Sequence, residues 1–208
     1  MTESGKSIWR WTGIIGLLVF VAGLLGYGGF RLSTASMGRS DIVRSHGNPV
    51  GGSFKIVTLT GSTATDGDYR GKWFLVWFVD PRCPDERCYP PMKRLDQALA
   101  QMKQERHPIV PVVLSLNYSA PDTDDLEDYF KDAAVDYSPF YATENMTRAM
   151  TALYHAPLVK EREGYYAPAQ NYVLMDPEGH YAASIPTTLS AEELHARLDK
   201  LVTGWGKQ

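Results

Sequence analysis

Cysteine is scarce in this sequence, and its scarcity excludes one class of protein. The 208 residues contain only two cysteines, Cys83 and Cys88, both in the stretch "FVDPRCPDERCYPPM". A pair so close in the chain cannot link distant parts of a fold, which excludes a small secreted domain stapled by disulfides. The pair is instead a crosslink within one loop, a redox pair, or two thiolates for a soft metal.

An excess of positive charge is also lacking. The chain carries 21 Lys and Arg residues against 24 Asp and Glu residues, for a formal net charge of −3. Nucleic-acid binding normally requires a clustered basic surface, so we expect no nucleic-acid partner. The composition, 44% apolar and 22% charged, is ordinary for a globular domain with a core of its own.

Charge is absent altogether from one long segment near the N-terminus, "WTGIIGLLVFVAGLLGYGGF" at positions 11–30. At about 1.5 Å per residue, a helix of this length crosses the roughly 30 Å hydrocarbon core of a bilayer. We predict that residues 11–31 form an uncleaved transmembrane anchor. Small residues at positions 33–36 leave a cleaved signal peptide open, although the apolar run is long for one.

The residues beside this segment predict its orientation. Lys6 and Arg10 favour a cytoplasmic location for residues 1–10. The protein would then be a single-pass protein of a bacterial inner membrane, with its domain facing the periplasm. Residues 32–50, rich in Gly, Ser, Arg and Asn, read as a tether, and residues 51–208 as one domain.

The hydrophobic pattern of this domain predicts an α/β fold. Two continuous apolar runs, at 73–79 and 109–116, are typical of strands buried on both faces, and a helical pattern to about residue 105 lies between them. A crossover helix between two strands implies a parallel pair. Further patterns predict a strand at 54–59, helices at 122–133, 143–155 and 190–202, and a hairpin of strands at 171–175 and 180–184. The order predicts a thioredoxin-like mixed sheet flanked by helices.

The two cysteines follow the first buried strand, at the sheet edge where reaction sites collect in α/β folds. Pro90 and Pro91 suit the first turn of a helix, so we expect residues 83–89 to be loop and the helix to begin at the prolines. The free N–H groups of a helix start stabilise a nearby thiolate, and Arg82 and Arg87 act in the same direction.

Motifs spread over residues 51–202 resemble the Sco/SenC family. They are "GGSFKIVTLTG", "DYRGKWFLVWF", "CPDERC", "SLNYSAPDTDDLEDYF", "ALYHAPLV", "NYVLMDPEG" and "LSAEELHARLDKLV". The resemblance implies a membrane-anchored, thioredoxin-like copper chaperone of cytochrome c oxidase assembly, with a copper site of two cysteines and one histidine. Such a protein delivers copper to oxidase subunit II or reduces the cysteines of that subunit.

The sequence departs from the family pattern twice, and both departures touch the site. The family has three residues between its cysteines, whereas four separate Cys83 from Cys88. The position of the family histidine is held by Pro168, and no histidine occurs from residue 156 to 175. The resemblance therefore implies Cys83 and Cys88 as copper ligands but does not supply the third.

The chain has five histidines that could substitute. His155 is the best candidate, because the chain that leaves its helix leads towards the cysteines. His180 is expected on a surface strand far from them, and His46 lies in the tether. His107 and His195 are expected to be solvated helix residues.

Three further side chains near the motif are candidates for the site. Met92 is either a soft ligand or, more commonly for methionine, a core residue. Tyr89 and Tyr166 are candidates to line the site.

Pro168 precedes a strand, where thioredoxin-like oxidoreductases place a cis-proline opposite the cysteines, so it could take that role. Asp80 and Asp85 could steer protons during thiol exchange. The alternative is that Asp80 and Asp85 only solvate the loop and the approach to the helix.

Three functions remain open. The first is a copper chaperone that holds Cu(I) with Cys83 and Cys88. The second is a thiol-disulfide reductase, in which Cys83 attacks and Cys88 resolves the mixed disulfide. The third is a non-catalytic assembly or redox-sensing factor. Whether the protein is an enzyme thus stays open, and the expected partner is oxidase subunit II or another cuproprotein.

Overall fold

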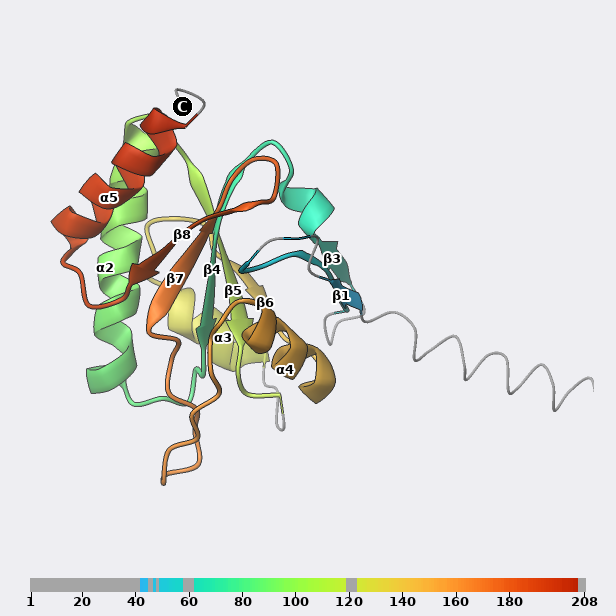
Figure 1. Cartoon of the computed structure of the whole chain (residues 1–208). Coiled ribbons are helices and arrows are strands. Elements are labelled where there is room, and N and C mark those ends of the chain that lie inside the picture. The colour runs from blue at the N-terminus through green and yellow to red at the C-terminus, as the bar shows by residue number, and fades with distance from the viewer. Residues whose placement is uncertain (1–41, 45–46, 48, 58–61, 119–122, 206–208) are drawn as a thin grey trace, which may run out of the picture. The chain divides into compact units, whose positions relative to one another are not determined.

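A computed structural model describes residues 42–44, 47, 49–57, 62–118 and 123–205 (Figure 1). The predicted cytoplasmic residues 1–10, the predicted anchor at 11–31 and most of the predicted tether lie outside these ranges. Among the residues that are described, no helix is both long enough and apolar enough to cross a membrane.

A five-stranded mixed sheet forms the centre of the domain. Its order is β6-β5-β4-β7-β8. The strands are β4 (Trp73–Val79), β5 (Ile109–Ser115), β6 (Ser138–Phe140), β7 (Asn171–Met175) and β8 (Tyr181–Pro186). β4, β5 and β6 run parallel, while β7 is antiparallel to both β4 and β8. The predicted parallel pair and closing hairpin are confirmed. β6 was not predicted, because three residues are too few to show a period.

Three short antiparallel strands form a second sheet, in the order β1-β2-β3. They are β1 (Ile42–Arg44), β2 (Ser53–Val57) and β3 (Thr63–Thr65), and the 3-10 turn η1 (Asp66–Tyr69) follows. The strand predicted from residue 54 corresponds to β2 and begins one residue earlier.

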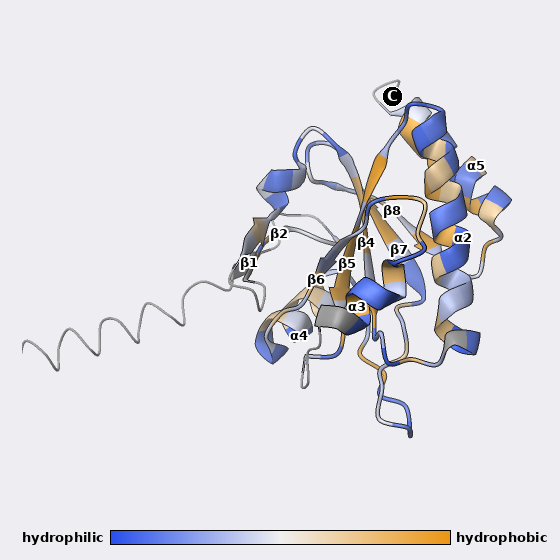
Figure 2. Cartoon of the chain, turned by 180° about the vertical axis from the view of Figure 1, so that it is seen from behind, coloured by the Kyte–Doolittle hydropathy of each residue, from blue (hydrophilic) through white to orange (hydrophobic). Residues whose placement is uncertain are grey.

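Four helices accompany the central sheet in the described chain. They are α2 (Asp85–Gln104), α3 (Thr123–Phe130), α4 (Glu144–Leu153) and α5 (Ala191–Gly204). α2 and α5 pack side by side, and α4 lies on the other side of the sheet in both views (Figures 1 and 2). α3 adjoins the start of α2, where the Tyr129 hydroxyl donates to the carbonyl oxygen of Cys88 at 2.9 Å. The predicted thioredoxin-like arrangement of a mixed sheet between helices is confirmed.

The core follows the apolar patterns of the sequence. Figure 2 shows the hydrophobic residues concentrated on the central strands. Every residue of β4 from Phe74 to Val79 is buried. The apolar stripe of α2 is buried as well; it consists of Met92, Leu95, Leu99 and Met102. Each such side chain contributes about 1.5–3 kcal/mol on burial, so β4 and α2, which flank the cysteine segment, are both anchored in one hydrophobic core.

α2 begins earlier than the sequence predicted. Its first residue is Asp85, with Pro84 as N-cap, so Cys88 lies in the first turn and not in a loop. The Cys88 N–H donates to the carbonyl of Pro84 at 3.1 Å, which closes this turn. Pro90 and Pro91 therefore lie inside the helix. The prediction was wrong because an acidic residue at the helix start favours initiation there, and the fixed φ of proline is compatible with helix.

Candidate functional site

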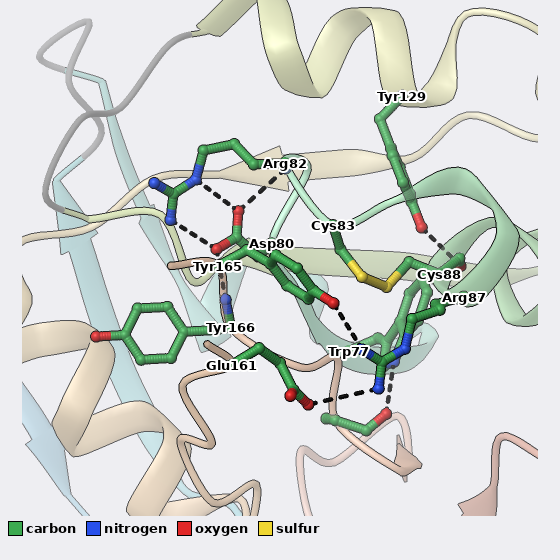
Figure 3. Close-up of a disulfide and its surroundings, with 11 residues drawn as sticks. Trp77, Asp80, Arg82, Cys83, Arg87, Cys88, Tyr129, Glu161, Tyr165 and Tyr166 are labelled. Carbon is green, nitrogen blue, oxygen red and sulfur yellow. Dashed lines mark hydrogen bonds and ion pairs between the residues drawn. A yellow bond between two sulfur atoms is a disulfide. The ribbon is translucent and has the colours of Figure 1, made fainter. Parts of the chain in front are cut away.

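Cys83 and Cys88 form a disulfide with a Cα–Cα distance of 6.0 Å (Figure 3). Cys83 lies between β4 and α2, where its N–H donates to the carbonyl of Asp80 at 3.0 Å. Cys88 lies in the first turn of α2. On a continuous helix, residues five apart point about 140° away from each other. The pair can meet because Cys83 precedes the helix and approaches from outside it.

Both cysteines are buried, but they differ in their contact with the surface. Cys83 is 4% exposed and lines a pocket of about 640 Å³, whereas Cys88 is completely buried. A partner molecule can therefore approach the disulfide from the side of Cys83.

Three residues that separate sequence arguments named as site candidates line the same pocket. Its lining includes Cys83, His155 and Pro168. His155 follows α4 and has a positive φ of 53°, which turns the chain away from the helix axis. The expectation that the chain after α4 leads towards the cysteines is therefore met. The idea of a cis-proline at Pro168 is wrong, because the described residues contain no cis peptide bond.

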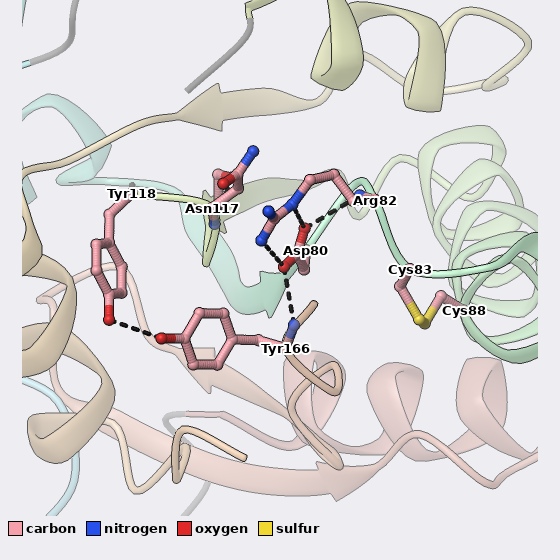
Figure 4. Close-up of polar contacts among 8 residues, drawn as sticks. Asp80, Arg82, Cys83, Cys88, Asn117, Tyr118 and Tyr166 are labelled. Carbon is pink, nitrogen blue, oxygen red and sulfur yellow. Dashed lines mark hydrogen bonds and ion pairs between the residues drawn. A yellow bond between two sulfur atoms is a disulfide. The ribbon is translucent and has the colours of Figure 1, made fainter. Parts of the chain in front are cut away.

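Asp80 is the polar anchor beside the disulfide (Figure 4). Its carboxylate is fully buried and accepts hydrogen bonds from the backbone N–H, Nε and Nη2 of Arg82 at 3.1, 3.0 and 2.7 Å. It also accepts one from the Tyr166 N–H at 2.8 Å. The hydrogen bonds from the Arg82 guanidinium to Asp80 raise the pKa of Arg82 above its usual value. Asp80 is thus not a loop-solvating acid, and the guanidinium of Arg82 is bound to Asp80. The side chain of Asp85 lies outside the described part.

Arg87 connects the start of α2 to the segment after α4 (Figure 3). Its Nη1 donates to the Tyr165 hydroxyl at 2.6 Å, and its Nη2 lies 3.6 Å from Oε1 of Glu161. Tyr165 is 5% exposed and packs with Cys83 and Cys88 in a small buried cluster, apart from the main core.

Sequence reasoning selected Tyr166 for the site and missed Tyr165. The hydroxyl of Tyr166 instead forms a 2.7 Å hydrogen bond with that of Tyr118, on the side away from the disulfide (Figure 4). Neighbouring residues in extended chain point to opposite sides, so only one of two adjacent tyrosines can face the cysteines. Tyr89 packs edge-on against Tyr129 of α3.

The fit to a three-ligand metal site is poor. Within the described ranges, no group of three His, Cys, Asp or Glu side chains is arranged to hold a metal ion. Pro168, at the position of the family histidine, has no ring nitrogen that can bind a metal. Met92 is 2% exposed and belongs to the core.

The other histidines have partners elsewhere. His180 lies beside Asp176 at the β7–β8 turn, His107 beside Asp199, and His195 hydrogen-bonds with Glu105 at 2.8 Å. His180 thus lies on the surface, as expected. His195 has a mostly buried side chain, so the prediction that it is solvated was wrong. His46 lies outside the described part of the chain.

The central sheet, the flanking helices and the cysteine pair at the start of α2 define a thioredoxin-like protein. Within this class, residues 43–203 match the model of the SCO1/SenC family. The chain belongs to the SCO1/SenC family.

Relatives and solved structures agree with this assignment. "Protein SCO2, mitochondrial" of Saccharomyces cerevisiae is 24% identical over 183 residues, covering 83% of this chain. The chain spans only 60% of the length of that relative. The crystal structure of Arabidopsis thaliana ScoI with copper bound matches with a TM-score of 0.68 and 18% identity, over 75% of this chain and 99% of that one.

A second solved structure concerns a disulfide. BsSco, in which a disulfide switch is identified, is described as a member of the Sco family of cytochrome c oxidase assembly proteins. It matches with a TM-score of 0.60 and 12% identity, over 77% of this chain and 98% of that one. At these identities the structural matches show the fold.

Proposed function

We propose that this protein is a cytochrome c oxidase assembly factor that performs thiol–disulfide exchange on the copper-site cysteines of its client. The observation that carries this proposal is that Cys83 lines the pocket, whereas Cys88 does not line it and is completely buried. Exchange requires one thiol that the client can reach and a second thiol nearby that resolves the mixed disulfide. Family membership, and the description of BsSco as an oxidase assembly protein, support the identity of the client.

The chemistry balances as a transfer of two electrons to the client. The Cys83 thiolate attacks the client disulfide, forms a mixed disulfide and releases one client thiolate. The Cys88 thiolate then attacks the sulfur of Cys83, which closes the disulfide and releases the second client thiolate. The protons of the two cysteines pass to the client thiolates. A dithiol protein must afterwards reduce the Cys83–Cys88 disulfide.

The environment favours the thiolate forms that these steps need. Cys88 lies in the first turn of α2, whose free N–H groups and dipole stabilise negative charge. Arg87, which carries a positive charge, belongs to the same helical turn as Cys88. We further propose that residues 11–31 anchor the protein in a bacterial inner membrane with the domain in the periplasm, where the oxidase subunit is within reach.

Carriage of copper is the second candidate. Two thiolates are suitable ligands for Cu(I), and Arabidopsis thaliana ScoI and yeast Sco1 have been crystallised with copper bound. The observation that favours this candidate is that His155 and Cys83 line one pocket. In this role copper would be cargo for oxidase subunit II or another cuproprotein.

The test of exchange uses the full-length chain in detergent and the oxidised copper-binding domain of oxidase subunit II. We expect the reduced protein to convert one client disulfide to two thiols per molecule. Cys88→Ser should accumulate a mixed disulfide, because the resolving thiol is gone, and Cys83→Ser should form none. Failure of Cys88→Ser to trap the client would refute exchange.

A Cu(I) titration against a competing chelator tests the second candidate. One tight equivalent that is lost in Cys83→Ser and Cys88→Ser and weakened in His155→Ala would establish copper carriage. His180→Ala serves as the matched control, since His180 lies at the β7–β8 turn. Absence of tight binding by the reduced protein would exclude copper carriage. Normal oxidase assembly with Cys83 and Cys88 both replaced by serine would leave only a non-catalytic role.

A further inference from the structure

We infer that Tyr165 gates the disulfide: its ring shields the sulfur of Cys88, Arg87 holds the ring in place, and incoming thiols therefore react at Cys83. This inference rests on the proposed thiol–disulfide function and names the residue that decides which sulfur reacts.

The position of Tyr165 is the first argument. Tyr165, Cys83 and Cys88 form a buried cluster of their own, so the phenol ring contacts the reacting group (Figure 3). Tyr165 and Cys83 both line the pocket, while Cys88 is completely buried. An aromatic ring here fills space through which a second thiol would otherwise reach the disulfide.

The second argument is that Arg87 holds the hydroxyl end of the Tyr165 ring, an interaction called the latch below. The hydrogen bond from Arg87 to the Tyr165 hydroxyl is 2.6 Å long and charge-assisted, the stronger kind of hydrogen bond. Glu161 lies 3.6 Å from the same guanidinium. Arg87 directly precedes Cys88, so the latch and the shielded cysteine share one helical turn. The residue that holds Tyr165 therefore belongs to the cysteine motif itself.

The backbone around Tyr165 is fixed, which is the third argument. The Glu161 N–H donates to the Tyr165 carbonyl at 2.9 Å, and Lys160 pairs with Tyr166 in an isolated bridge. The Tyr166 N–H is bound to the buried carboxylate of Asp80. Opening therefore requires rotation of the Tyr165 side chain, with loss of its bond to Arg87, and not a shift of the segment.

The gate gives re-reduction a defined order. A thiolate of the dithiol donor attacks the sulfur of Cys83, the S–S bond breaks, and its electron pair stays on Cys88 as a thiolate. The second donor thiol then attacks the donor sulfur of the mixed disulfide, releases Cys83 and leaves the donor oxidised. The two donor protons end on the two cysteines, so atoms and electrons balance.

The first test measures the rate at which dithiothreitol reduces the disulfide in the full-length protein in detergent. Tyr165→Phe keeps the ring and removes its hydrogen bond to Arg87, and we expect reduction about twofold faster, because attack at Cys88 becomes a second route beside attack at Cys83. Tyr165→Ala also removes the ring and should be faster still. Tyr166→Phe is the matched control, because its hydroxyl bonds to Tyr118, and its rate should equal that of the unchanged protein.

The second test asks which sulfur reacts, a readout that a merely structural role would not alter. The reduced protein is treated with less than one equivalent of iodoacetamide and digested with trypsin. Cleavage after Arg82, Arg87 and Lys93 separates Cys83 and Cys88 into the peptides CPDER and CYPPMK. We expect the label on Cys83 in the unchanged protein and on both cysteines in Tyr165→Ala.

The outcomes separate the gate from the proposed function. Equal reduction rates and equal labelling in the unchanged protein and both Tyr165 variants would overturn the gate, whether or not the client is reduced. If Tyr165→Ala does not fold, Tyr165→Phe decides alone through its rate. If the Tyr165 variants behave as expected but the client disulfide is not reduced, the gate stands and the proposed client reaction fails.

Discussion

At the scale of single residues, Asp80 shows how a charge is kept inside this protein. Its fully buried carboxylate accepts hydrogen bonds from Arg82 and from the backbone of Tyr166, which lies 86 residues further along the chain. A buried charge is tolerated only when it is paired and hydrogen-bonded in this way. Asp80 thus joins the cysteine loop to the segment that carries Tyr165.

We predict that Asp80→Ala destabilises the protein by about 3 kcal/mol, because the change leaves several buried donors and the Arg82 guanidinium without their acceptor. Chemical denaturation of the full-length protein measures the change. Glu144→Ala removes an exposed ion pair to Arg148 and should leave the midpoint almost unchanged. A small effect of Asp80→Ala would show that the ion pair does not hold the two segments together.

At the scale of elements, the rules for helix starts locate the first residue of α5 well and that of α2 poorly. The helix predicted at 190–202 corresponds to α5, and Ser190 and Glu193 form a capping box at its start, a pair of residue types that the sequence itself displays. The start of α2 was assigned to Pro90, whereas the helix begins five residues earlier at Asp85. Pro90 and Pro91 have no N–H to bond the carbonyls of Glu86 and Arg87. The first turn of α2, which contains Cys88, is therefore joined to the rest of the helix by fewer hydrogen bonds.

We predict that Ser190→Ala lowers the free energy of unfolding by about 1 kcal/mol, since the side chain accepts a hydrogen bond from the Glu193 N–H at 3.2 Å. Thermal and urea unfolding report the change. Thr188→Ala, an exposed position in the turn before α5, is the control and should change stability by less than about 0.5 kcal/mol. Equal effects of the two substitutions would argue that the cap contributes nothing.

At the scale of the whole molecule, buried tyrosines link stability to alkaline pH. Burial raises the pKa of Tyr137, Tyr154 and Tyr172 well above the ordinary value of 10.0. The folded protein keeps these phenols protonated, while the unfolded chain ionises them near pH 10. The contribution of these tyrosines to the free energy of unfolding is therefore complete below about pH 10. It is lost as the pH rises towards the pKa values of the folded state.

We predict that the free energy of unfolding falls above pH 10 by about 1.4 kcal/mol per pH unit for each of these tyrosines. Tyr137→Phe should reduce this slope by the share of one residue. At neutral pH it should cost little, because the Tyr137 hydroxyl is buried without a hydrogen-bond partner among the described residues. Urea unfolding at several pH values between 9 and 12 measures the slope, and an unchanged slope in Tyr137→Phe would contradict the prediction.

The sequence by itself determined the elements whose residues carry a long local pattern. The continuous apolar run of β4, the stripe of α2, the β7–β8 hairpin and the cap of α5 could all be predicted, because burial and capping impose periods and residue types that a short window reveals. The cysteine motif predicted the candidate site, and the family could be recognised from motifs in order.

Tertiary structure alone decided which side chains meet at that site. Asp80 and Tyr166, Arg87 and Tyr165, and Cys83 and His155 are each more than 70 residues apart, or lie in segments without a period. Between Tyr165 and Tyr166 the choice depended on the direction of one segment, whose Tyr166 N–H is bound by the Asp80 carboxylate at the end of β4. Such contacts arise from the packing of distant segments around one core, and no local pattern in the chain records them.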